Sequence, residues 1–325
     1  MSSVAANGGN VGWASAGPRT RHRDVLAAHG ASLRPDADGR SYLQSVPDGQ
    51  PGRWNTDLAA FAHDLPVVHP GTALDVPAYL ARIGLDAAPV ADLAGLQRLQ
   101  LAHLVSIPFE NLDIATGRPM SLALPALQAK ILGARRGGFC YELNGLFAEL
   151  LRVLGFRVTL LAAETWSPEA MRWGRPFDHL VLRVDLDRPY LVDVGFGDSF
   201  REPLPLAAGA EQSDPTGGVF QLTRDDGRWL LAKRASDDEP GSPLFRFDDV
   251  PHVLDDFAEA CRWQQESSTF FTRHRVVELL TPGGRRVLFD NRYLTREGVE
   301  RGERTVAEAE VPDLLRERFG LEIQG

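Results

Sequence analysis

The stretch RRGGFCYELN, residues 135–144, has the pattern from which the rest of the chain can be interpreted. Two glycines precede Cys140, one of only two cysteines in 325 residues, and apolar residues of helical period follow it. This pattern predicts a tight turn that feeds a helix, with the cysteine at the helix start. Unpaired N–H groups and the helix dipole there are expected to favour the thiolate. Gly137 and Gly138 are expected to let a ligand approach the backbone.

Two downstream residues are candidate partners for Cys140, which taken alone could equally be a small buried hydrophobic residue. His179 and Asp193 lie in two strand-like runs that a turn-rich segment, residues 185–189, separates. A hairpin centred on Leu186 would place the two directly opposite, with Cβ atoms roughly 5 Å apart. The aspartate would then hold one imidazole nitrogen and leave the other for the thiol. Each residue alone has a structural explanation, but together they predict a Cys-His-Asp triad.

With these residues in place, the sequence resembles the arylamine N-acetyltransferase family. The resemblance extends over about residues 74–325. It implies an α+β fold with an N-terminal helical bundle, a central antiparallel β-barrel, a C-terminal α/β lid and a cysteine-protease-like Cys-His-Asp core. The matching motifs are residues 136–140, Asn144, His179 and residues 192–197, with residues 75–84 and 107–112 upstream and residues 267–270 and 292–295 downstream.

The resemblance implies transfer of an acetyl group from acetyl-CoA to an arylamine or hydrazine. The scheme would be ping-pong through an acetyl-cysteine, with Cys140, His179 and Asp193 as catalytic residues. Acetyl-CoA would be a co-substrate, and no metal is expected. Residues expected to contact substrate or CoA are Phe109, Gly195, Phe196 and Gly197. Residues expected to support the site are Arg136, Glu110 and Asn144, and Arg136 is expected to orient Glu142 or Glu110.

Three alternatives share parts of this pattern. An amide synthase that closes a macrolactam from a polyketide-type acyl thioester would use the same triad with a different pocket and lid. A cysteine peptidase or transglutaminase-like enzyme has the same residue order, but papain-type spacing places the histidine about 130 residues after the cysteine. Here the histidine follows after 39 residues. A non-catalytic binding protein on the same scaffold is disfavoured by the complete triad.

The composition restricts the function classes further. Apolar residues make up 43% of the chain and charged residues 24%, as in ordinary globular proteins. The net charge of −9, without a long basic run, disfavours nucleic-acid binding. Two cysteines form no disulfide framework and favour a reducing cytoplasm, and the absence of a C-x-x-C pair disfavours a zinc site. The sequence contains no run of about 18 apolar residues, so no membrane span is predicted. The physiological acceptor, the acyl-chain preference and the oligomeric state stay open.

Changes of pattern along the chain predict four segments. Residues 1–72 are expected to be a poorly ordered extension with one short helix at residues 53–65, although a regulatory arm or a misassigned start would also fit. Residues 73–156 read as a helical domain that carries the nucleophile. Residues 157–250 read as a β-barrel with strands at 157–165, 179–184, 190–194, 219–223 and 229–233. Residues 251–325 read as an α/β lid, in which Cys261 is structural.

Overall fold

The chain divides into two compact units, Met1–Val67 and Val68–Gly325. The computed structural model describes residues 73–234, 241–268 and 270–321, together with the backbone of β1 (Ser32–Pro35), β2 (Ser41–Gln44) and β3 (Asn55–Thr56). These three strands form an antiparallel sheet in the order β1-β2-β3. The helix expected at residues 53–65 is wrong where β3 forms. The rest of that expected helix lies outside the described residues. The same holds for the expectation that the extension up to residue 72 is poorly ordered.

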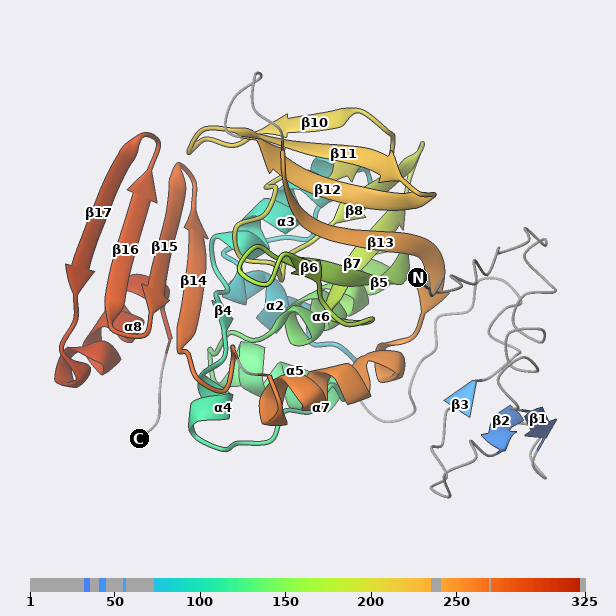
Figure 1. Ribbon diagram of the computed structural model, residues 1–325, viewed down its shortest axis with the longest axis horizontal. Helices are drawn as coiled ribbons and strands as arrows, with labels where there is room; N and C mark the ends of the chain where they lie inside the picture. Colours follow the sequence, from blue (N-terminus) through green and yellow to red (C-terminus); the bar gives the residue numbers. More distant parts are fainter. Residues whose placement is uncertain are drawn as a thin grey trace, which may run out of the picture. The chain divides into compact units, whose positions relative to one another are not determined.

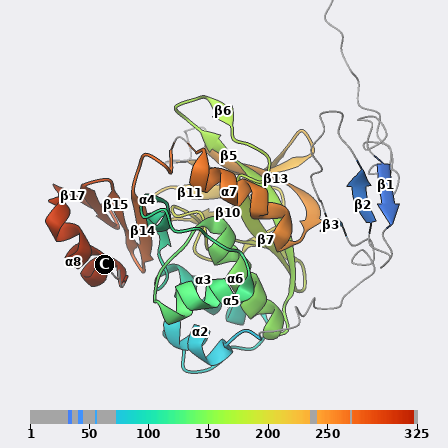
Figure 2. The same ribbon diagram turned by 90° about the horizontal axis from the view of Figure 1, so that it is seen from below.

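The helical part of the second unit is built around α6, whose apolar side chains are almost all buried. Helices α2, α5 and α6 lie together in both views (Figures 1 and 2). Asp75 caps α2 by accepting the Ala78 N–H at 2.9 Å, and Asp92 caps α3 by accepting the Gly95 N–H at 2.8 Å. The helices are α2 (Val76–Arg82), α3 (Leu93–Leu104), α4 (Leu112–Ala115), α5 (Leu124–Leu127), the π-helix η2 (Gln128–Gly133) and α6 (Cys140–Val153).

The central sheet is a nearly closed antiparallel barrel with the strand order β10-β11-β12-β13-β5-β7-β8-β9, and β6 pairs with β5. All five expected strands are present. The long strand β13 was not expected, although it links β12 to β5. The strands are β5 (Arg157–Ser167), β6 (Arg172–Trp173), β7 (His179–Asp185), β8 (Pro189–Val192), β9 (Leu204–Pro205), β10 (Ala210–Ser213), β11 (Val219–Asp225), β12 (Arg228–Arg234) and β13 (Ser242–His252).

A second antiparallel sheet, in the order β17-β16-β15-β14-β4, follows the barrel in sequence (Figure 1). Its inner strand β4 comes from the helical part of the chain, and Glu278 of β14 pairs with Phe109 of β4. Because Phe109 also forms a β-bridge with Gly138, this pairing connects the C-terminal sheet to the turn before Cys140. The elements are β4 (Phe109–Glu110), the 3₁₀ helix η3 (Leu254–Phe257), α7 (Ala258–Glu266), β14 (Val276–Thr281), β15 (Gly284–Phe289), β16 (Arg292–Glu297), β17 (Glu300–Thr305), the 3₁₀ helix η4 (Glu308–Glu310) and α8 (Val311–Phe319).

A buried histidine joins three helices in the core. Nδ1 of His103 on α3 lies 2.7 Å from the Tyr79 hydroxyl on α2, and the edge of its ring meets Phe147 on α6 with centroids 5.3 Å apart. Both His103 and Tyr79 are fully buried. Burial lowers the pKa of His103 to about 3, because the imidazolium form would lose its hydration.

Stability is therefore expected to fall as the pH is lowered. His103 stays neutral in the folded protein between its ordinary pKa of 6.5 and about 3, whereas the unfolded chain takes up a proton in that window. Between pH 7 and pH 5 this costs about 2 kcal/mol of unfolding free energy, at about 1.4 kcal/mol per pH unit below the ordinary pKa. Urea unfolding of the wild type and of His103→Gln at both pH values measures it. If the unfolding free energy of His103→Gln depended on pH as strongly as that of the wild type, titratable groups other than His103 would be responsible for the lost stability.

Candidate active site

Cys140 is the first residue of α6 and is buried, with Phe139 at the N-cap position. The two preceding glycines are needed for close packing. A Cβ on Gly137 would lie 2.1 Å from the Pro108 carbonyl oxygen, and one on Gly138 would lie 2.7 Å from Oε2 of Glu142. On the Cβ side of both glycines, the space is filled by neighbouring residues of the chain, and the approach of a ligand to their backbone stays a prediction.

His179 and Asp193 are hydrogen-bonded, with Nε2 of the ring 2.8 Å from Oδ2 of the carboxylate. The expected register is nevertheless wrong. Leu182 pairs with Val192 and Asp185 with Pro189, so the hairpin is centred on Asp187 and its ladder ends before Asp193. The two residues meet all the same because a shift of two positions along a strand returns a side chain to the same face of the sheet.

Asn144 holds the aspartate from the same helix that carries the cysteine. It follows Cys140 by about one helical turn. Its Nδ2 donates to Oδ1 of Asp193 at 2.9 Å and to the Leu180 carbonyl at 2.7 Å, and its Oδ1 accepts the Val194 N–H at 3.0 Å. One amide side chain therefore fixes both barrel strands against the start of α6.

The segment that follows Asp193 lies close to Cys140 and to the His179 ring. A Cβ on Gly195 would lie 2.6 Å from the Cys140 Cα, so only glycine fits there. The Phe196 ring meets the edge of His179 with centroids 5.2 Å apart. Gly197 has φ +87°, and a Cβ there would lie 2.6 Å from Oε2 of Glu278. This segment therefore follows the site closely and ends against the C-terminal sheet.

The protonation of Cys140 differs from the sequence-based expectation. Burial raises the pKa of the Cys140 thiol well above its ordinary value, and the negative charge of Asp193 raises it further, while a hydrogen bond with the Leu180 backbone opposes the rise. The helix start alone thus does not produce a free thiolate. In this setting a thiolate is stabilised when a positive charge forms beside it, which an imidazolium at His179 would supply.

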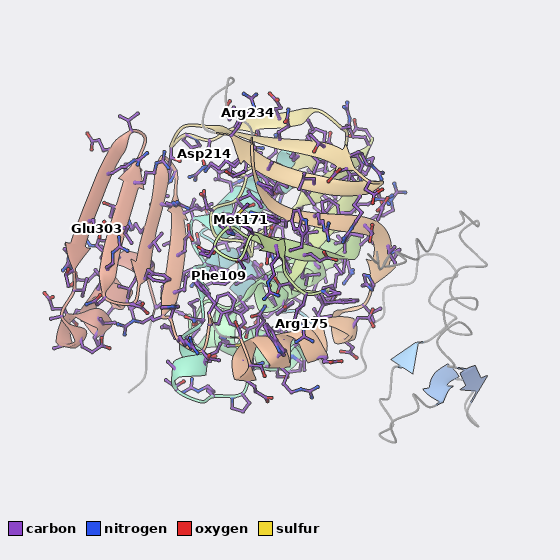
Figure 3. All side chains as sticks on the ribbon, viewed as in Figure 1. Phe109, Met171, Arg175, Asp214, Arg234 and Glu303 are labelled. Atoms are coloured by element: carbon purple, nitrogen blue, oxygen red, sulfur yellow. The ribbon has the colours of Figure 1, made fainter. Side chains whose placement is uncertain are left out.

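Aromatic rings pack around the turn that precedes Cys140. Phe109 is half-buried on β4, and its ring lies 5.8 Å from that of Phe139 and 6.1 Å from that of Phe271 (Figure 3). The Phe139 and Phe271 rings are 4.9 Å apart. The sequence pointed to Phe109 but not to Phe271. Phe270 and Phe271 are adjacent, and the sequence does not indicate which of the two rings faces the turn.

A network of buried charged side chains packs beside the Gly137–Gly138 turn. Arg136 pairs with Glu110 at 2.7 Å and with Asp113 at 3.0 Å. Arg136 thus orients Glu110 as expected, but the expected alternative, Glu142, pairs with Lys130 instead, at 2.8 Å. Lys130 also bonds Asp113 at 2.8 Å. Lys130 and Asp113 were missed from the sequence, although Lys130 precedes the motif by only a few residues.

Glu142 links this network to the backbone directly before Cys140. Its Oε2 accepts the Phe139 N–H at 2.9 Å, and burial raises its pKa while Lys130 opposes that rise. Glu110 plays a similar part by accepting the Leu112 N–H at 2.7 Å. Glu142 therefore holds the backbone directly after the glycine turn, and Glu110 holds the backbone between β4 and α4.

Lys130→Met is expected to destabilise the fold by about 3 kcal/mol, because it leaves the buried Glu142 carboxylate without its counter-charge. Adding Glu142→Gln should recover most of that loss, since the neutral amide needs no counter-charge and its oxygen can still accept the Phe139 N–H. Urea unfolding of the wild type, both single variants and the double variant measures the coupling. Strictly additive losses would contradict an energetic link between the two side chains.

The segment before His179 is held by four side chains. The Tyr141 hydroxyl donates to the carbonyls of Phe177 and Asp178 at 2.9 and 3.1 Å. The Asp178 carboxylate accepts from Gln264 at 2.6 Å and from the Thr165 hydroxyl. Asp178 thus adjoins His179 in sequence, but its carboxylate oxygens accept hydrogen bonds from Gln264 and Thr165 rather than from the imidazole.

These features agree with the comparisons with known proteins. A family model described as N-acetyltransferase matches residues 92–325. The arylamine N-acetyltransferase of Mycolicibacterium smegmatis is 36% identical over 263 residues, which cover 77% of this chain and 93% of that protein. The chain belongs to the arylamine N-acetyltransferase family. Members of this family are acyltransferases, and these matches favour neither the amide-synthase nor the binding-protein alternative.

Solved structures of the family share the fold. The arylamine N-acetyltransferase of Salmonella typhimurium superposes with a TM-score of 0.72 at 30% identity, covering 78% of this chain and 94% of that one. The arylamine N-acetyltransferase of Mycobacterium marinum in complex with CoA superposes with a TM-score of 0.69 at 30% identity, covering 76% of this chain and 93% of that one. The mixed α/β architecture with its nearly closed barrel is therefore that of the arylamine N-acetyltransferases.

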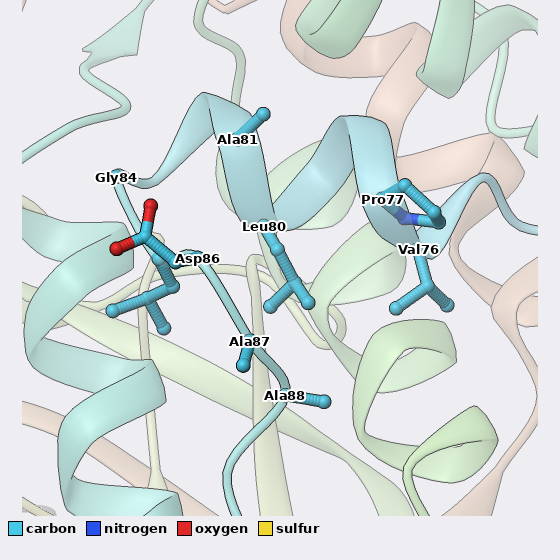
Figure 4. Close-up of a pocket in the computed structure, with 9 residues that line it drawn as sticks. Val76, Pro77, Leu80, Ala81, Gly84, Asp86, Ala87 and Ala88 are labelled. Carbon is cyan, nitrogen blue, oxygen red and sulfur yellow. The ribbon is translucent and has the colours of Figure 1, made fainter.

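Other features of the described residues lie apart from the predicted site. An open pocket of about 600 Å³ lies along α2 and the loop that follows it (Figure 4). Its lining, Val76, Pro77, Leu80, Ala81 and residues 84–88, includes none of the predicted site residues. Within the described ranges, no three His, Cys, Asp or Glu side chains are grouped to hold a metal ion. No helix in that part of the chain is long and apolar enough to cross a membrane.

Proposed function

We propose that the protein transfers an acetyl group from acetyl-CoA to an arylamine or hydrazine through an acetyl-cysteine at Cys140. The observation that carries the proposal is the Asn144–Asp193–His179 hydrogen-bond chain, built against the helix start that bears the cysteine. In this proposal the imidazole that Asp193 orients acts as the base for the Cys140 thiol. Family membership supports the acyl donor, since the Mycobacterium marinum relative was solved with CoA.

In the first half-reaction, His179 takes the thiol proton of Cys140 and becomes an imidazolium that Asp193 stabilises. The thiolate attacks the thioester carbonyl carbon of acetyl-CoA and forms a new sulfur–carbon bond. The bond between that carbon and the CoA sulfur then breaks, and CoA leaves as a thiol after taking the proton from His179. The raised pKa of Cys140 disfavours a thiolate without a neighbouring positive charge. The thiolate therefore forms only together with the imidazolium of His179, as one ion pair.

In the second half-reaction, the acceptor nitrogen attacks the acetyl carbon while His179 removes its proton as general base. The carbon–sulfur bond breaks, and the Cys140 sulfur recovers the proton, so the enzyme returns to its starting state. Oxyanion stabilisation in both halves falls to backbone N–H groups at the start of α6, which have no intrahelical acceptors. Each such donor is typically worth about 3 kcal/mol.

The remaining site residues have positioning or contact roles in this proposal. Arg136, Glu110 and Asn144 hold the turn and the aspartate. Phe109 lines the acceptor side, and residues 195–197 bring backbone close to the acyl donor. The helical part at residues 73–156 carries the nucleophile, the barrel at residues 157–250 carries His179 and Asp193, and residues 251–325 cover the site as a lid. Residues 1–72 precede this catalytic unit in the sequence.

Intact-mass measurement tests the proposal directly. Incubation with acetyl-CoA alone should add one acetyl group to the protein, and peptide mapping should place it on Cys140. Adding an arylamine such as 4-aminobenzoate should remove the group and yield the acetylated amine. The ping-pong scheme would be excluded if acetylated amine formed only when both substrates were bound at once and no acetyl-protein appeared at any time.

A further inference from the structure

The outer strand of the C-terminal sheet has a free edge. Among the residues that the structure describes, β17 pairs only with β16, and all six of its residues, Glu300 to Thr305, are exposed. Glu303 lies at this outer edge, far along the sheet from β4 (Figure 3). A free edge presents unpaired backbone N–H and C=O groups that can accept another strand. The edge is therefore a candidate docking surface, and its side chains decide for which partner.

The backbone pattern identifies which residues face outward. Val306 donates its N–H to the Asn291 carbonyl at 2.8 Å. Hydrogen-bonded positions alternate along an antiparallel strand, so residues 304, 302 and 300 also direct their backbone groups toward β16. Arg301, Glu303 and Thr305 consequently direct theirs away from the sheet. An added antiparallel strand would have to pair its own outward residues with these three.

The sequence of β17, ERGERT, is charge-complementary to itself about Gly302. Antiparallel pairing of two copies centred on that glycine places Glu300 opposite Arg304 and Arg301 opposite Glu303. By symmetry each pair occurs twice, so all four charged residues of both strands face an opposite charge. We infer that β17 is a self-association edge, at which two copies of this chain pair as antiparallel strands about Gly302 and join their C-terminal sheets into one.

The charges also select this register over its neighbours. A symmetric pairing centred one residue earlier places Arg301 opposite Arg301, and one centred one residue later places Glu303 opposite Glu303. Like charges directly opposite each other destabilise a strand pair, whereas opposite charges stabilise it. The backbone excludes the registers centred between two residues, because these place an outward residue opposite one whose groups face β16.

Existing contacts of these side chains are compatible with the pairing. Arg292 bonds Glu303 at 2.8 Å, and both side chains are about half exposed, so this ion pair is weak and exchangeable. Val299 in the adjoining turn is 92% exposed, and the register places it beside Thr305 of the second copy. The interface is only one strand wide, so the dimer should be weak, populated at roughly 100 µM.

Analytical ultracentrifugation of the full chain over a concentration series tests the inference. The wild type should dimerise, and added salt should weaken the dimer because the ion pairs are exposed. Glu303→Arg places arginine opposite Arg301, and Arg301→Glu places glutamate opposite Glu303. Each variant alone should dimerise at least about tenfold more weakly. An equimolar mixture of the two should dimerise again, because every position then faces an opposite charge.

The mixture also controls for misfolding, since a damaged hairpin would not recover its pairing. Melting temperature and acetyl transfer should be unchanged in both variants, because β17 is exposed and contributes no site residue. A wild type that stays monomeric up to about 500 µM would overturn the inference. So would a dimer that either variant forms as tightly as the wild type, because another surface would then be responsible, and so would a mixture that fails to associate.

Discussion

Cys140→Ala is expected to abolish acetyl transfer while the protein stays folded. In the proposed scheme the thiol carries the acetyl group, so its loss removes both half-reactions. We expect turnover to fall by more than about 10³-fold, with no acetyl-protein after incubation with acetyl-CoA. The buried side chain loses a single sulfur atom, so stability should change by only about 1 kcal/mol. Steady-state rates, intact mass and urea unfolding of one preparation measure all three.

Cys261→Ala is the matched control. Cys261 is also a buried cysteine, on α7, and burial raises its pKa to about 12. Its sulfur accepts only from Gln265 in the same helix, at 3.5 Å. This variant should lose about as much stability as Cys140→Ala but keep its activity and its acetylation. Activity within about tenfold of the wild type in Cys140→Ala, or its loss in Cys261→Ala, would remove Cys140 from the nucleophile role.

Local sequence pattern accounts for most of the fold. Leucine stripes predicted the helices because a packed helix needs one apolar face, and alternating apolar residues predicted five barrel strands. β13 escaped because Pro243, Pro251 and the Asp248–Asp249 pair are typical of loops. The structure accommodates these residues with irregular pairing on both sides of the strand. Tertiary pairing, which the local pattern does not contain, makes this segment a strand.

The candidate site shows the same division. Cys140, His179 and Asp193 could be found because each lies in a short motif with its own turn or strand signal. Lys130 and Asp113 could not, because their partners in the network are brought together only when the chain packs. The direction of the Cys140 pKa shift was missed for a related reason. The helix start is visible in the sequence, but the burial of the thiol, which outweighs it, arises only when segments distant in sequence, such as that of Gly195, pack against Cys140.

Asp193→Asn is expected to lower the rate by about 10⁴-fold, the loss typical when the carboxylate of such a triad becomes an amide. The reason lies in three hydrogen bonds. Oδ1 of Asp193 accepts from Asn144 at 2.9 Å and from the Gly195 N–H at 2.8 Å, so an asparagine must keep its oxygen at that position. Its NH₂ group then faces Nε2 of His179. The imidazole is forced to carry its proton on the other nitrogen, which can no longer accept the thiol proton.

Asp178→Asn separates this effect from a general loss of negative charge near His179. Asp178 directly precedes the histidine in sequence but accepts from Thr165 and Gln264. The Thr165 hydroxyl can rotate to accept from an amide, so the asparagine keeps both side-chain contacts of Asp178. We expect Asp178→Asn to retain activity within about tenfold of the wild type. If both variants lost activity equally, the charge rather than the tautomer would be responsible, and if Asp193→Asn turned over normally, His179 would not act through Asp193.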